Sequence, residues 1–130
     1  MTNPNARGPA LARAAEAMLR ALGGTEVKFR CPSGAAEDEQ ARQLGMEAPG
    51  TEDISIAPVV VRSSGEALEL LIAPSSVAPY MQDRGQTAEQ FFDAILAVVH
   101  GGRELRVQLF HVEQFAGAEY LYRVTVVAGG

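Results

Sequence analysis

The chain of 130 residues has no tryptophan and a single cysteine, Cys31. One cysteine allows no disulfide within the chain, so the sequence favours a reducing compartment. No stretch approaches the roughly 20 apolar residues that a membrane-spanning helix needs. The opening segment MTNPNARGPA is polar and lacks the apolar centre of a signal peptide. These absences predict a cytoplasmic protein with no membrane contact.

Positive charge is also scarce. The chain carries 11 lysine and arginine residues against 16 aspartate and glutamate residues, which gives a net charge of −5 at pH 7. All the basic residues except Lys28 are arginines, and they are scattered along the chain. Because phosphates repel an acidic protein and no basic stripe is present, the sequence argues against non-specific binding to nucleic acid.

Two segments have the apolar spacing of amphipathic helices. Residues 1–8 are polar and predict a disordered tail, so the first helix is expected to begin at Pro9 and to end at Gly23-Gly24. The second helix is expected over Thr87–Val99, where Thr87 and Gln90 have the spacing of a capping box. Everything from residue 9 to residue 128 is expected to form one domain.

Alternating or β-branched apolar runs predict strands. They are Thr25–Cys31, Ile54–Arg62, Ala67–Ala73 and two within Arg103–Ala128. The second and third should pair as a hairpin, with Pro58 at an edge or a bulge, and the last two are joined by the turn Ala116-Gly117-Ala118. Residues 32–53 are expected to be a long loop, and Pro74 to Gly85 a turn region. The order of elements predicts an α+β fold with an antiparallel, strongly twisted sheet or small β-barrel, an N-terminal helix and a second helix before the C-terminal hairpin.

The sequence contains no strong candidate for a catalytic or metal-binding site. Cys31 has no nearby base, so a structural cysteine is the simpler interpretation than a nucleophile. His111 and Glu113 share one face of a strand and could begin a metal site, whereas His100 is expected to end the second helix. These observations favour no catalytic residue, no metal and no cofactor.

Two groups of residues could serve other roles. Glu37, Asp38 and Glu39 form an acidic cluster, which could do acid–base chemistry only if it were buried, so a solvated loop is the simpler interpretation. Tyr120 and Tyr122 lie on one face of the last strand. That face packs in the core on the simpler interpretation, and it forms an interface if it is exposed.

The order of these elements resembles that of the small head–tail joining, or head-completion, proteins of long-tailed bacteriophages and prophages. The residues that carry the resemblance are Leu70-Leu71-Ile72-Ala73-Pro74-Ser75-Ser76-Val77, followed by Gly102 to Val107 and Phe115-Ala116-Gly117. This chain differs by its helix at Thr87–Val99, which could cover an open end or edge of the barrel.

The resemblance implies a non-enzymatic structural protein that assembles as a ring at the head–tail junction or in the tail. The partners would be copies of itself, in some cases only after docking, and adjacent virion proteins. The long loop would reach neighbours through Glu37, Asp38, Glu39 and Arg42, and Tyr120 and Tyr122 complete the candidate interface. An acidic lining would allow passive contact with DNA passing through. The expected location is the host cytoplasm during assembly and then the virion.

Two other interpretations remain open. The chain could be a cytoplasmic accessory module that binds a small ligand or a protein, which a deep apolar pocket with converging polar groups would favour. It could also be an enzyme that uses Cys31 or the pair His111 and Glu113, which a triad within hydrogen-bond reach would favour.

Overall fold

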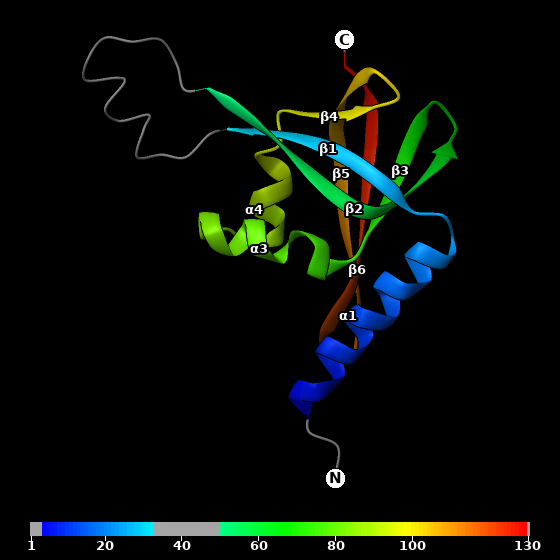
Figure 1. Cartoon of the computed structure of the whole chain (residues 1–130), viewed down its shortest axis with the longest axis vertical. Coiled ribbons are helices and arrows are strands. Elements are labelled where there is room, and N and C mark those ends of the chain that lie inside the picture. The colour runs from blue at the N-terminus through cyan, green and yellow to red at the C-terminus, as the bar shows by residue number, and fades with distance from the viewer. Residues whose placement is uncertain (1–3, 33–49, 130) are drawn as a thin grey trace, which may run out of the picture.

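The computed structural model describes residues 4–32 and 50–129. Six strands form a closed antiparallel barrel in the order β1-β2-β3-β6-β5-β4. Of the described residues, three segments form helices that pack on the barrel (Figure 1). The elements are α1 (Pro4–Ala21), β1 (Thr25–Pro32), β2 (Thr51–Ser64), β3 (Ala67–Ile72), α3 (Pro74–Arg84), α4 (Ala88–Asp93), β4 (Ala97–His100), β5 (Arg103–Phe115) and β6 (Ala118–Ala128). The barrel confirms the predicted α+β fold class. The sequence left open a twisted sheet or a small barrel, and the structure has the closed barrel.

Local sequence explains the hairpins of the barrel. β2 and β3 pair from Val59 opposite Ile72 to Ser64 opposite Ala67, and Gly65 supplies the positive φ of 65° in their turn. β5 and β6 are joined at Ala116-Gly117, where both residues have positive φ, as a two-residue hairpin turn of the favoured handedness requires. We call β5, this turn and β6 the β5–β6 ribbon. Both hairpins were predicted from the sequence.

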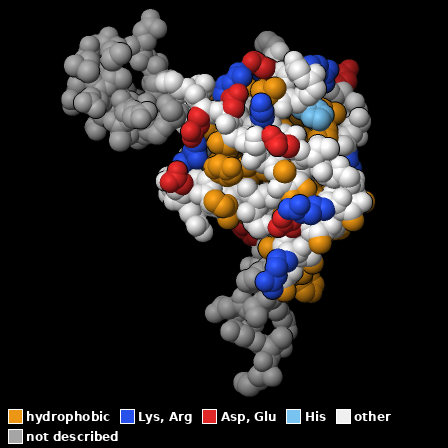
Figure 2. All heavy atoms as spheres, in the orientation of Figure 1, with side chains coloured by type: hydrophobic (Ala, Val, Ile, Leu, Met, Phe, Trp, Pro, Cys, Tyr) orange, Lys and Arg blue, Asp and Glu red, His pale blue; other side chains and the backbone are white. Residues whose placement is uncertain are grey.

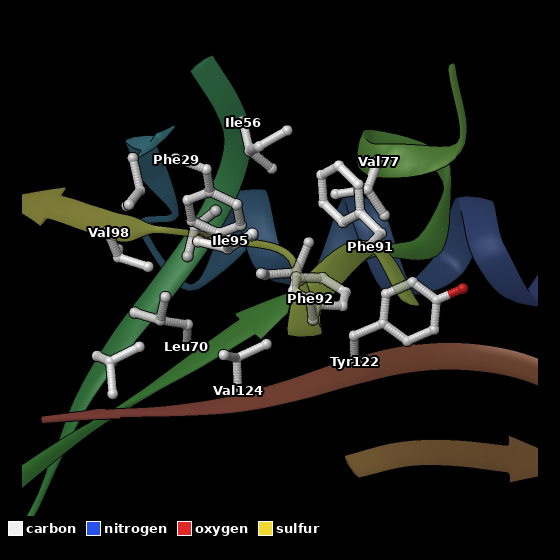
Figure 3. Packing of buried hydrophobic residues seen from close by; sticks show 14 of the residues in the cluster. Phe29, Ile56, Leu70, Val77, Phe91, Phe92, Ile95, Val98, Tyr122 and Val124 are labelled. Carbon is white, nitrogen blue, oxygen red and sulfur yellow. The ribbon is translucent and has the colours of Figure 1, made fainter. Parts of the chain in front are cut away.

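Apolar side chains from every strand fill the barrel interior. Strand alternation directs Val27 and Phe29 of β1 inward, and Tyr122 and Val124 of β6 meet them from the opposite side. Figure 3 shows Phe29, Tyr122 and Val124 converging with side chains of α3 and α4. No polar or charged residue is buried among the described residues. The interior is therefore an apolar core.

Phe92 of α4 lies at the centre of this core. Its ring stacks on Phe110 at a centroid distance of 4.7 Å. It also meets the rings of Phe91, Phe29 and Tyr122 edge-on, at centroid distances of 5.2, 6.2 and 5.7 Å. Such aromatic pairs stabilise beyond the area they bury. One side chain thus joins a helix to three strands of the barrel.

The first helix lies outside the barrel. α1 begins at Pro4, so the helical segment starts before the expected Pro9, and it ends where Gly23 takes a positive φ of 84°. Its buried Leu19 packs with Leu71 and Leu121, which project from the outer face of β3 and β6. The side chain of Ser75 in α3 donates a hydrogen bond to Glu16 at 3.0 Å. A second, smaller apolar cluster therefore fixes α1 to the barrel wall.

The segment from Pro74 to Gly85 corrects the sequence prediction of a turn region. It forms α3, with Pro74 in the first turn and Gly85 ending the helix at a φ of 62°. Proline is tolerated in the first helical turn because the N–H that it lacks would have no partner there. Burial of Val77 in the core fixes the helix against the barrel. Tertiary packing thus overcomes the helix-breaking effect of Pro79.

The predicted helix over Thr87–Val99 is wrong in its second half. The capping box of Thr87 and Gln90 is present, but α4 ends at Asp93 and β4 follows at Ala97–His100. Val98 pairs with Phe29 on one side and Leu105 on the other, which closes the barrel. The hydrogen bonds that β1 and β5 offer outweigh the helical pattern of this run. His100 accordingly ends a strand and does not end a helix.

The long loop is shorter than predicted. β2 already begins at Thr51, which pairs with Pro32 of β1, so residues 51–53 belong to the sheet. Pro58 lies at the register shift between β1 and β2, as the sequence predicted. The remainder of the expected loop, residues 33–49, lies outside the described residues. Among the helices that the structure describes, none has the length and apolar character to cross a bilayer.

We expect Phe92→Ala to lower the free energy of unfolding by about 3–5 kcal/mol, because it removes the central ring and leaves a cavity. Urea denaturation followed by circular dichroism measures this change. The matched control is Phe115→Ala, since Phe115 is 60% exposed, and we expect a change within about 0.5 kcal/mol. Equal effects of the two substitutions would contradict the central role of Phe92.

Candidate functional site

A row of charged side chains crosses the outer wall of the barrel. Arg62 of β2 pairs with Glu69 of β3, which lies directly opposite it. Arg123 of β6 lies 4.0 Å from Glu69 and 3.2 Å from Glu113 of β5. Charges thus alternate over four adjacent strands, and we call Arg62, Glu69, Arg123 and Glu113 the charge ladder. Cross-strand pairs of opposite charge stabilise a sheet and hold its register.

Glu69 is the least exposed member of the charge ladder, with 21% of its side chain accessible. The hydrogen bond from Arg62 lowers the pKa of this carboxyl below its ordinary value of 4.5, and the charge of Arg123 adds to the effect. Glu69 therefore remains ionised in the folded chain at any neutral or mildly acidic pH. Its role is to link β3 to β2 through Arg62 and to β6 through Arg123.

The candidate metal residues belong to this same wall. His111 Nε2 lies 3.5 Å from Glu113 Oε1, so the two side chains do come together as their spacing predicts. Glu113 also accepts a hydrogen bond from Arg123. His100 lies on β4, opposite Arg103 at the start of β5. Within the described part of the chain, no three side chains of the ligating kinds lie together.

Cys31 lies in the core. It is 3% exposed, and burial raises the pKa of its thiol above the usual range. A raised pKa keeps the sulfur protonated at neutral pH, which makes it a poor nucleophile. The geometry therefore supports the structural interpretation of this cysteine.

The two tyrosines proposed for an interface differ in position. Tyr122 is 2% exposed and belongs to the barrel core, and its hydroxyl donates a hydrogen bond to Glu119 at 2.8 Å. Burial, with the Glu119 carboxylate, raises the pKa of its hydroxyl. Tyr120 is partly buried against the smaller cluster that holds α1. Tyr122 is thus a core residue and is not placed to meet a partner. Glu37, Asp38, Glu39 and Arg42 lie outside the described residues.

The ribbon exposes apolar side chains that the sequence analysis did not single out. Leu109 and Phe115 of β5 are 65% and 60% exposed, and Leu22 at the end of α1 is 61% exposed. Figure 2 shows one face of the molecule, on which small groups of hydrophobic side chains lie among acidic and basic ones. Leu109 and Phe115 belong to the same strand, so β5 is a candidate contact surface.

A groove of about 440 Å³ runs between α4 and β5. Residues 107–112 of β5 form one wall and supply its accessible apolar surface. Phe92 and Ile95 border the groove on the other side, but both are buried. Glu89 and Asp93 are exposed in the same lining. No local sequence motif marks this groove, because it arises where the end of α4 meets a strand that is distant in the sequence.

Comparison with known proteins gives no family for the chain. No protein-family model matches it, and no curated protein or solved structure matches it significantly. The class that the described residues define is a small closed antiparallel barrel with α1 on its wall and with α3 and α4 packed against its core.

We expect Glu69→Gln to lower stability at pH 7 by roughly 0.5–1 kcal/mol, because it removes the charge between two arginines. The folded-state pKa of Glu69 is lowered, so this contribution exists above the unfolded pKa and is lost as pH falls through the folded pKa. The difference between wild type and variant should therefore shrink below about pH 4. Urea denaturation over a pH series measures it.

Glu66→Gln is the matched control for Glu69→Gln, since Glu66 is exposed in the turn between β2 and β3. It should leave stability unchanged at every pH. A Glu69→Gln effect that does not depend on pH would argue against an electrostatic role for the charge ladder.

We expect Cys31 to react with a thiol-specific reagent at least about a hundredfold more slowly in the folded chain than in denaturant, because the folded sulfur is buried and protonated. Absorbance of the released chromophore at pH 8 measures both rates. Rapid modification of the native chain would revive Cys31 as a reactive group.

Proposed function

We propose that this protein is a non-enzymatic structural component of a phage or prophage virion, acting at the head–tail junction or in the tail. It works through contacts with copies of itself in a ring and with adjacent virion proteins. The observation that carries the proposal is the β5–β6 ribbon, which presents Leu109 and Phe115 to solvent from the wall of a packed barrel. The resemblance in element order supplies the class of assembly.

The ribbon is well suited to make contacts between proteins. β5 and β6 are long and pair along nearly their whole length, so the exposed side chains are held on a stiff two-stranded surface. Figure 1 shows β5 and β6 crossing the barrel behind β1 and β2 and running toward α1. A preformed surface loses little conformational entropy on binding, which favours association.

The barrel interior supports a structural role over a ligand-binding role. Large side chains such as Phe29, Phe92 and Tyr122 fill it. A small-ligand module would need a chamber with a few converging polar groups. The candidate nucleophile Cys31 is buried, and Glu113 is engaged by Arg123.

Charge is compatible with a position beside the genome. A net charge of −5 gives weak repulsion of DNA phosphates. A channel component with this property would let DNA slide past in passive contact. The proposed location is the host cytoplasm during assembly and the virion afterwards.

We expect deletion of the gene from its phage or prophage to leave DNA-filled heads and free tails that fail to join. Negative-stain electron microscopy of lysates shows this directly, and expression of the wild-type chain in trans should restore complete particles. Intact infectious particles made without the protein would contradict the proposal.

The same complementation assay tests the ribbon. Phe115→Asp should reduce the yield of infectious particles at least about tenfold, because a charge replaces an apolar contact at an interface. Leu22→Asp is the matched control, since Leu22 is exposed to the same degree, 61% against 60%, but lies at the end of α1. Circular dichroism of both variants verifies that the fold is kept.

A further inference from the structure

Three long strands of the described barrel extend past the strand beside them. β2 pairs with β3 only from Val59 onward, and β6 pairs with β3 only from Tyr122 onward. β5 pairs with β4 only over Arg103–Leu105. Each extension leaves backbone N–H and C=O groups on one side without a partner strand, and such edges can pair with another chain.

Helices cover two of these edges. α3 lies along the first half of β2, where Ser76 donates a hydrogen bond to the Ala57 carbonyl at 3.1 Å and Tyr80 donates one to the Ser55 carbonyl at 3.5 Å. α1 packs against the start of β6 through Leu19 and Leu121. These contacts satisfy or shield the edges.

The third edge, residues 106–115 of β5, faces the groove beside α4. β6 is its only partner strand among the described residues. The groove lining includes residues 107–112 of this edge, where Leu109 is exposed and Phe110 and Val112 are half-buried, and the exposed carboxylates of Glu89 and Asp93. It therefore combines a strand edge, accessible apolar side chains of β5 and negative charge.

We propose that this groove binds an extended segment of a neighbouring protein, which adds a strand to β5 and places lysine or arginine side chains against Glu89 and Asp93. The identity of the neighbour as a virion protein rests on the proposed function, whereas the mode of binding rests on the groove. Strand addition draws its affinity from main-chain hydrogen bonds and its specificity from alternate side chains.

The dimensions fit a short segment. Residues 107–112 span about 20 Å at roughly 3.3 Å per residue, so they can pair with five or six residues of a partner strand. One set of alternate side chains of that strand would lie beside the half-buried Phe110 and Val112 of β5, and we therefore expect apolar residues at every second position. Because two acidic side chains line the groove, a basic segment is favoured over an acidic one.

The groove favours a flexible arm over a second barrel. α4 stands beside the edge as a second wall, so an occupant must lie between helix and strand as a single extended segment. The long edges of a second copy are either covered by helices or are the same β5 edge, and its body would have to approach past α4. Self-association through β5 is thus the rival outcome of the test.

The test begins with the full chain as bait for a displayed library of random twelve-residue peptides. We expect the enriched peptides to share apolar residues at alternate positions and at least one lysine or arginine. The best peptide is then synthesised with a fluorescent label, and its binding to the wild-type chain is measured by anisotropy. Failure of any peptide to be enriched on the wild-type chain would overturn the proposal.

The acidic lining is tested with the double variant Glu89→Gln/Asp93→Asn, which should weaken peptide binding at least tenfold. The matched control Glu26→Gln/Glu66→Gln makes the same change in net charge at exposed positions away from the groove and should leave binding unchanged. Equal weakening by both variants would show attraction to the net charge alone and would overturn the groove as the site.

Hydrogen exchange on the wild-type chain distinguishes strand addition from contact through side chains alone. Saturation with the peptide should slow exchange of outward-facing amides in residues 107–112 at least tenfold. Peptide binding without slower exchange of these amides would overturn strand addition. Slower exchange of the same amides through self-association of the chain, without peptide, would overturn it as well. These measurements use the isolated chain and need no virion. Strand addition can therefore be disproved while the deletion phenotype still supports the proposed function, and the proposed function can be disproved while strand addition is confirmed.

Discussion

The packing of Phe92 inside the barrel is the interaction on which the rest of the structure depends. Its ring contacts Phe29 of β1, Phe110 of β5 and Tyr122 of β6 from a helix of one and a half turns. A helix so short has little stability of its own, so burial of this ring holds it in place. Once α4 is held, the chain emerges beside β1 and β5 and forms the short β4 that closes the sheet. The helix that fills the core therefore also leads the chain into the strand that closes the barrel.

The shortness of β4, the strand that closes the barrel, also shapes the outer surface of the protein. β4 can pair with only the first residues of β5, so the rest of β5 extends past it. The barrel shields its other long edges with α1 and α3, whose side chains bond to strand carbonyls or pack on the wall. The edge that α4 leaves accessible lies beside exposed Leu109. The same constraint that completes the core thus produces the surface best suited to meet another protein.

These features give a consistent picture of function. Two of the candidate chemical groups have structural roles: Cys31 is buried and protonated, and Glu113 belongs to the charge ladder. The described residues expose the β5–β6 ribbon and the acidic groove to solvent. These surfaces support the proposal that the protein acts by contact, and the resemblance in element order is the reason for proposing the junction between a phage head and its tail.

The sequence by itself determined the elements whose signals are local. The alternation of Val27 and Phe29, the turn at Gly65 and the turn at Ala116-Gly117 predicted strands and hairpins that the structure confirms, and the capping box of Thr87 fixed the start of α4. Tertiary structure decided the rest. It made Ala97–His100 a strand, made Pro74–Arg84 a helix, buried Tyr122, and assembled both the charge ladder and the groove. The physical reason is that strand pairing and burial join residues far apart in the chain, and local periodicity carries no information about which distant strand offers the hydrogen bonds.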